Sequence, residues 1–221
     1  MTERLRQSAL VGAINTRARR VPVWAIYLLG ALPAAWIVWL TLQGGLGIDP
    51  VKEIEHRLGK LGLQFLAGGL AVTPLRTWVG VNLLKFRRAL GLLAFWYVLA
   101  HLAAWVVLDM GLLWAQMGRD ILKRPYITIG MLAFALMLPL AITSNAASIR
   151  RLGARWRLLH RLVYPAAVLG ALHFILLVRT WQPEPMLYLA GIAALLLLRL
   201  GILRRTGRAA GNAPVRGAGR A

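Results

Sequence analysis

The chain has 221 residues, 59% of them apolar and only 15% charged, a composition that excludes an ordinary soluble domain and indicates several membrane crossings. The formal net charge of +20 comes from Lys and Arg in the short segments between apolar runs, so we attribute it to membrane topology and not to nucleic-acid binding. Because cysteine is absent, disulfides, thiolate metal sites and a cysteine nucleophile are excluded.

Six apolar stretches are long enough to cross a bilayer, since a hydrocarbon core of about 30 Å needs roughly 20 residues of helix. They cover residues 22–42, 61–79, 89–108, 125–143, 158–178 and 185–203. The predicted fold is all-α, a polytopic membrane helical bundle of six transmembrane helices at 21–204. A basic arm at 1–20 precedes the bundle, and a flexible tail rich in Gly, Ala and Arg follows it at 205–221.

Two segments near the amino terminus differ from the other spans and connections. The first apolar run follows Arg17, Arg19 and Arg20, as a signal-peptide core follows its basic residues. It is longer than such a core and no small-residue cleavage site stands out near its end, so we expect a retained helix. The stretch 49–60 is too polar to span and is expected to be a connection at the membrane surface.

The basic residues also orient the bundle, because loops on the cytoplasmic side are enriched in Lys and Arg. With the amino terminus in the cytoplasm, 20 of the 27 basic residues fall on that side, and six of the seven acidic residues fall on the other. We therefore expect both termini in the cytoplasm of a multi-pass protein of a bacterial inner membrane.

Three of the four histidines lie within the predicted spans, where an ionisable side chain often marks an ion, proton or cofactor site. Neutral imidazole binds iron well, so haem is the first hypothesis. His101 and His173 each lie roughly 10 to 12 Å inside the non-cytoplasmic end of their spans and are predicted to hold one haem iron from both faces. Gly170 and Ala104, each three residues from one of them, are expected to leave room for a flat ligand.

His160 precedes His173 by 13 residues, which is about 20 Å along a helix and suits a second haem nearer the cytoplasm. In an ideal helix the two side chains point about 140° apart, and Pro165 between them is expected to kink or unwind the helix. The alternative for all three histidines is a hydrogen bond between helices or a proton relay. For His160, beside Arg157 and Arg161, a solvated position is a further alternative.

Several short segments resemble those of a known family. They are DPVKEIEH at 49–56, TPLR at 73–76, RRALGL at 87–92, RPYIT at 124–128, RRLGARW at 150–156, LHRLVY at 159–164 and HF at 173–174. In order and spacing they are similar to the haem-binding membrane subunits of bacterial periplasmic methionine sulfoxide reductase systems, the MsrQ (formerly YedZ) family of the ferric-reductase-like transmembrane group. The resemblance covers residues 49–174.

The resemblance implies a b-type cytochrome with one or two haem b groups and FMN. Its electrons would come from the quinone pool or a cytosolic flavin reductase. They would pass to a periplasmic molybdopterin-containing partner, MsrP, in a heterodimer that repairs methionine sulfoxide in oxidised proteins. Substrate reduction would then take place on the partner.

The resemblance also implies that His101, His160 and His173 are haem axial ligands. The wider group has a fourth histidine near the cytoplasmic end of the third span, where this chain has Arg87 and Arg88. These two arginines are candidates for contacts with haem propionates or for a second cofactor site.

A second class of function stays open, a transporter or structural membrane subunit whose buried histidines relay protons without haem. For transport the sequence offers no paired intramembrane carboxylates and no evident inverted repeat. It also has no Ser-His-Asp arrangement and no nucleotide-binding glycine motif, so soluble-type chemistry is not expected.

Overall fold

The computed structural model describes residues 2–178 and 182–211, and within them the chain is helical and contains no strand. Six helical segments in this part are long and apolar enough to cross a membrane. They are built on α2 (Val23–Leu42), α3 (Pro50–Pro74), α4 (Arg87–Ala104), α6 (Pro125–Ile142), α9 (Val163–Leu177) and α10 (Pro183–Gly211). The predicted six-helix membrane bundle is confirmed, and the chain is a membrane protein.

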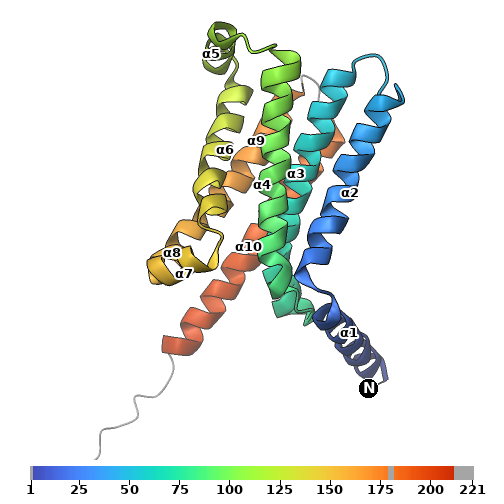
Figure 1. Cartoon of the computed structure of the whole chain (residues 1–221). Coiled ribbons are helices and arrows are strands. Elements are labelled where there is room, and N and C mark those ends of the chain that lie inside the picture. The colour runs from blue at the N-terminus through green and yellow to red at the C-terminus, as the bar shows by residue number, and fades with distance from the viewer. Residues whose placement is uncertain (1, 179–181, 212–221) are drawn as a thin grey trace, which may run out of the picture.

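The helices α3 and α4 form the centre of the bundle (Figure 1). The helix α2 lies on one flank and α6 on the other, while α9 packs on α6 and α10 packs on α9 and α3. The short helix α5 (Trp114–Lys123) lies at one end of the bundle, and α1 (Thr2–Arg20) lies at the other. We call these the α5 end and the α1 end. The last turns of α10 also lie at the α1 end, as an even number of crossings requires.

The start of α3 corrects the sequence prediction. The polar stretch 49–60 was expected to be a surface connection, but the helix begins at Pro50, and the membrane-length segment runs from Pro50 to Val79. The Asp49 side chain caps the helix by accepting a hydrogen bond from the Lys52 backbone N–H at 3.2 Å, and proline at the first helical position favours a start there. Glu53 and Arg57, one turn apart, are ion-paired at 2.6 Å, which gives the polar turns local support.

The bounds of the other spans agree with the prediction to within a few residues. The third span extends α4 by a 3₁₀ turn (Leu84–Phe86) before it and a π-helical turn (Trp105–Asp109) after it. The last helix α10 continues to Gly211, past the predicted boundary of the flexible tail, and residues 212–221 lie outside the described part of the chain.

The fifth span is interrupted near His160. The short helices α7 (Ala146–Leu152) and α8 (Ala154–Leu159) lead into a 3₁₀ turn (His160–Leu162), and α9 begins only at Val163. Pro165 cannot donate the backbone hydrogen bond that a continuous helix would need there, so the unwound turn lies just before it. The predicted irregularity is therefore present, and the orientations of His160 and His173 are not those of one ideal helix.

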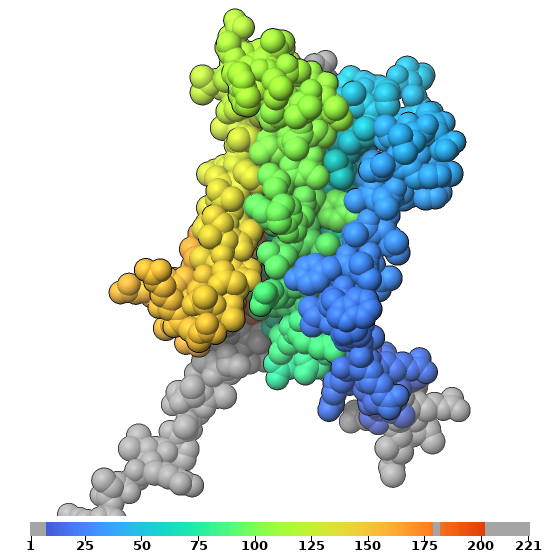
Figure 2. Space-filling view, viewed as in Figure 1, coloured from blue at the N-terminus to red at the C-terminus, as the bar shows by residue number. Residues whose placement is uncertain are grey.

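The core is apolar and tightly packed at the centre of the bundle. Ala94 of α4 and Ala166, Ala167 and Ala171 of α9 are completely buried, and these small residues let the helices approach closely. The helix α2 lies on the outside of the bundle (Figure 2) and exposes large apolar side chains such as Trp24, as a lipid-facing helix does.

Candidate functional site

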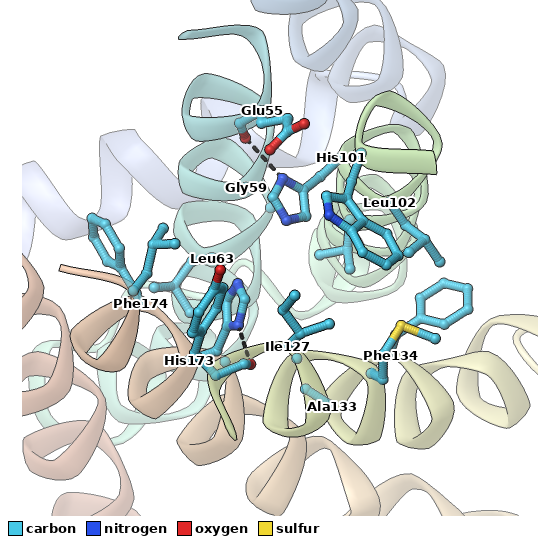
Figure 3. Close-up of a pocket in the computed structure, with 18 of the residues that line it drawn as sticks. Glu55, Gly59, Leu63, His101, Leu102, Ile127, Ala133, Phe134, His173 and Phe174 are labelled. Atoms are coloured by element: carbon cyan, nitrogen blue, oxygen red, sulfur yellow. Dashed lines mark hydrogen bonds between the residues drawn. The ribbon is translucent and has the colours of Figure 1, made fainter. Parts of the chain in front are cut away.

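Two histidines from different helices meet inside the bundle. His101 on α4 and His173 on α9 have ring centroids 6.1 Å apart, and their ring planes lie at 74° to one another. Figure 3 shows the two rings directed toward a common space between α3, α4, α6 and α9. Residues 72 positions apart in the sequence are thus brought together, as the matched depths of the two histidines predicted.

Each ring is fixed by a hydrogen bond to a backbone carbonyl of the neighbouring helix. His101 Nδ1 lies 2.8 Å from the carbonyl oxygen of Glu55 on α3, and His173 Nδ1 lies 2.7 Å from that of Tyr126 on α6. Because a carbonyl only accepts, Nδ1 carries the proton in each case. In the neutral imidazole Nε2 then keeps its lone pair, which is the arrangement typical of metal-binding histidines.

The two rings line a cavity of about 360 Å³. Its interior wall is apolar, with Leu63, Leu66, Phe134 and Met137 among the lining side chains. Gly59, Gly62, Gly130 and Gly170 also line it, and the absence of side chains at these positions widens the space between the helices. The predicted role of Gly170 agrees with this position. Ala104, in contrast, does not line the cavity and is buried in a second apolar cluster with Ile37.

The α5 end of the cavity is charged. Its lining includes three basic residues, Lys52, Lys60 and Arg124, and two acidic ones, Glu55 and Asp109. Each basic residue has an acidic partner, in the pairs Lys52–Asp49, Lys60–Glu184 and Arg124–Asp120. The Oε1 atom of Glu55 is buried and has no hydrogen-bond partner among the described residues, so this end of the cavity has an unmet polar requirement.

The ligand set suits a prosthetic group better than a bare metal ion. In the described part of the chain, no group of three or more His, Asp or Glu side chains is placed to hold a metal ion. Two imidazoles are enough when the other ligands come from a flat macrocycle that carries its own metal. A cavity with apolar walls and a charged end matches such an amphipathic group.

His160 lies apart from this cavity. Its Nδ1 is 3.1 Å from the carbonyl oxygen of Trp156, its Nε2 is 3.5 Å from Ser144 Oγ, and its ring stacks on the Trp156 indole at 3.8 Å between centroids. Arg87 is close enough to interact electrostatically with His160, whereas Arg88 is exposed. Neither arginine lines the cavity between His101 and His173, so their predicted roles and that of His160 concern a separate region.

Sequence reasoning missed the groups that hold the two rings. The acceptors are backbone carbonyls, which no residue type identifies. Glu55 and Gly59 on one helix repeat the separation of Tyr126 and Gly130 on another, but this spacing is about one helical turn and does not by itself identify an acceptor.

Comparison with known proteins agrees with this site. The family described as Ferric reductase like transmembrane component matches residues 57–171, so the fold and the site define a ferric-reductase-like membrane protein. Curated relatives from Brucella ovis, Brucella canis and Brucella suis carry the name protein-methionine-sulfoxide reductase heme-binding subunit MsrQ. Each is 49% identical over 197 residues, which cover 86% of this chain and 90% of the relative. The chain belongs to the MsrQ family, as its sequence segments predicted. No solved structure matches it.

Proposed function

We propose that the chain is a b-type cytochrome subunit in which His101 and His173 are the axial ligands of one haem b. The observation that carries this proposal is the pair of imidazoles whose Nδ1 atoms are committed to backbone carbonyls, which leaves each Nε2 atom free to bind iron. The relatives' name, a heme-binding subunit, supports the same cofactor.

The dimensions of the site support this cofactor. Two imidazoles that bind one metal from opposite sides, with metal–nitrogen bonds of about 2 Å, have ring centres roughly 6 Å apart. The observed centroid separation is 6.1 Å. The cavity of about 360 Å³ also lies within the common range for cofactor sites, about 300 to 1,000 Å³.

The charge distribution supports one orientation of the haem. Its apolar edge would lie against Leu66 and Met137, and its propionates would point to the α5 end, within reach of Lys52, Lys60 and Arg124. The hydrogen bond from Arg124 to the Tyr126 hydroxyl and the nearby Asp120 raise the pKa of Arg124, so its positive charge is secure.

The protein's own groups would set the properties of the site. Haem supplies reversible one-electron chemistry when it is bound. His101 and His173 hold it without adding charge, and the carbonyls of Glu55 and Tyr126 keep both rings in the metal-binding tautomer. The apolar wall would limit the access of water to a bound haem, and this burial together with the hydrogen bonds of the two histidines would tune its reduction potential.

We further propose the direction of electron flow. The excess of basic residues at the α1 end supports a cytoplasmic location for that end and for both termini, in a bacterial inner membrane. The His101–His173 cavity is nearer the α5 end, which would be periplasmic. Electrons from the quinone pool or a cytosolic flavin reductase would then pass to a periplasmic, molybdopterin-containing, MsrP-like partner in a heterodimer. That partner would reduce methionine sulfoxide in oxidised proteins, as the relatives' name suggests.

A second haem near His160 is part of the proposal. Supporting it are the contact of His160 Nδ1 with the Trp156 carbonyl, which leaves Nε2 with only a long 3.5 Å contact to Ser144 Oγ, and the nearby positive charge of Arg87, which suits a propionate or a phosphate. Arg88 is the second candidate contact there. FMN stays a prediction that rests on the family resemblance.

The test is the haem content of the purified protein. Protein from haem-replete cells, kept in detergent, should show a reducible b-type spectrum, and pyridine haemochrome analysis gives the number of haems per chain. His101→Ala and His173→Ala should each remove the same haem. His160→Ala, at a histidine that does not line this cavity, is the control and should leave that haem in place. A colourless wild-type preparation would refute the cytochrome proposal and favour a proton relay.

A further inference from the structure

Each of the two histidine rings lies against a glycine of the neighbouring helix. A Cβ atom added at Gly130 would lie 2.7 Å from His173 Nδ1 and 3.0 Å from its Cε1. A Cβ atom added at Gly59 would lie 3.2 Å from His101 Nδ1 and 3.4 Å from its Cε1. In both cases the ring occupies the space that any other residue would fill with a side chain.

Each of the two glycines lies four residues after the residue whose carbonyl accepts the hydrogen bond of the histidine ring. Gly59 follows Glu55 by four residues, and Gly130 follows Tyr126 by four. In an α-helix the carbonyl of a residue accepts from the N–H four residues later, so each glycine shares its acceptor carbonyl with a histidine. The carbonyl has a second lone pair for the Nδ1–H, but the ring reaches it only by lying over the Cα of that glycine.

We infer that Gly59 and Gly130 are positioning residues for the two haem ligands, and that a carbonyl with a glycine four residues later forms a repeated seat for each imidazole. This inference rests on the proposed function, because it concerns the orientation of ligands that would bind the haem. The glycines touch no iron themselves. They set where each Nε2 lies.

A methyl group at Gly130 cannot be accommodated while His173 keeps both its Nδ1 hydrogen bond to the Tyr126 carbonyl and the proposed bond of its Nε2 to the haem iron. A ring that moves away from the added Cβ moves into the cavity and also leaves the Tyr126 carbonyl, to which Nδ1 is held at 2.7 Å. Either shift displaces Nε2 from its position opposite His101. The Gly59 seat is looser by 0.5 Å at Nδ1, the difference between 3.2 and 2.7 Å, so a small displacement of His101 suffices there.

The seats can be tested with two variants and two matched controls. Gly130→Ala and Gly59→Ala fill the seats. Gly68→Ala on α3 and Gly91→Ala on α4 make the same change where no heavy atom lies within 4 Å of the added Cβ and where the cavity is not lined. All four changes replace glycine with a better helix former, so none should weaken its own helix.

Haem affinity is measured by titrating the haem-free protein in detergent with hemin. Loss of a group that orients a metal ligand commonly weakens metal binding by about 10- to 100-fold, and we expect that range for Gly130→Ala. For Gly59→Ala we expect less than about tenfold, together with a shifted midpoint potential and altered low-spin EPR g-values. The two controls should match the wild type in all three measurements.

Thermal unfolding of the haem-free forms separates a positioning defect from a folding defect. Without iron the His173 ring can turn away and gives up only its hydrogen bond to the Tyr126 carbonyl, while alanine favours the helix, so haem-free Gly130→Ala should unfold close to the haem-free wild type. If Gly130→Ala does not fold, Gly59→Ala provides the test. A shift in its midpoint potential and EPR g-values relative to Gly68→Ala supports the inference, and unchanged values overturn it.

The outcomes also separate this inference from the proposed function. A wild type that binds no haem refutes the proposed function itself. If the wild type binds haem and Gly130→Ala is indistinguishable from Gly91→Ala in haem affinity, midpoint potential and g-values, the positioning role of the glycines is overturned. The proposed cytochrome function is then unaffected.

Discussion

The helix α2 is joined to the bundle by an inserted tyrosine, and we expect Tyr97→Phe to weaken that junction. The Tyr97 hydroxyl donates to the carbonyl of Gly30 at 2.6 Å and accepts from the backbone N–H of Ala34 at 3.0 Å. In a regular helix Ala34 would bond to Gly30 directly, so the hydroxyl stands between the two groups. Pro33, which has no N–H, opens the same turn further.

The structure sets the size of the expected effect. The substitution removes two hydrogen bonds, and unless α2 closes its turn again it leaves the buried Gly30 carbonyl and the partly buried Ala34 N–H with no partner. Side-chain hydrogen bonds in membrane proteins contribute about 0.6 kcal/mol on average, and an unsatisfied buried group costs about 1 to 3 kcal/mol. We therefore expect a loss of about 1 to 3 kcal/mol in the free energy of unfolding. Phenylalanine retains the ring that stacks on Phe65, so packing changes little.

The assay is equilibrium unfolding in mixed detergent micelles, with the haem spectrum recorded in the same samples. Tyr188→Phe is the matched control, because the Tyr188 hydroxyl accepts one bond from Gln64 in an exposed pair. Its loss should be smaller. Tyr97 does not line the cavity, so the haem spectrum of folded Tyr97→Phe should be unchanged. A loss in Tyr97→Phe no larger than that in Tyr188→Phe would refute the reasoning.

Two further predictions concern charges near the α5 end. Arg124→Gln should weaken haem binding by up to about fivefold and lower the midpoint potential, because a nearby positive charge favours the reduced haem. Hemin titration measures the affinity and redox potentiometry the potential, with the exposed Arg119→Gln as the control. Equal values in the two variants would contradict the prediction. The hydrogen bond from Lys52 lowers the pKa of Asp49 below its usual 3.8. The ionised Asp49 therefore stabilises the folded protein at pH values above 3.8, its usual pKa, and this stabilisation is lost as the pH falls through the lower pKa of Asp49 in the folded state. Asp49→Asn, which keeps a capping side chain, should abolish this acid-side loss in unfolding experiments from pH 2 to 6, and an unchanged pH profile would count against it.

The spans were predictable because hydrophobic length is a property of the sequence alone. The pairing of His101 with His173 was predictable too, since depth along two helices of the same direction follows from the rise per residue. The start of α3 was missed although its signals were present. Asp49 followed by Pro50 is a helix start, but the charges of the next turns were given more weight than the cap.

The supports of the two rings were not predictable from residue types. Every helical residue carries the same carbonyl, so the acceptors at Glu55 and Tyr126 are defined only once the helices are packed. The local break at His160 was signalled by Pro165, but the stacking of the ring on Trp156 depends on how the unwound turn folds back on α8. Tertiary contacts decided each of these features.

The site depends on four of the six spans, and this has a physical consequence. The cavity is lined by residues of α3, α4, α6 and α9 and of the turns that flank them, and each histidine and its acceptor carbonyl belong to a directly packed pair, α3 with α4 or α6 with α9. Each pair fixes the orientation of one ring. The separation of the rings then depends on how the two pairs pack, through the contacts of α4 with α6 and of α3 with α9. Completely buried Ala94 on α4 and Ala167 on α9 lie in that shared core, so a larger side chain there would push the pairs apart and change the haem site without touching either histidine.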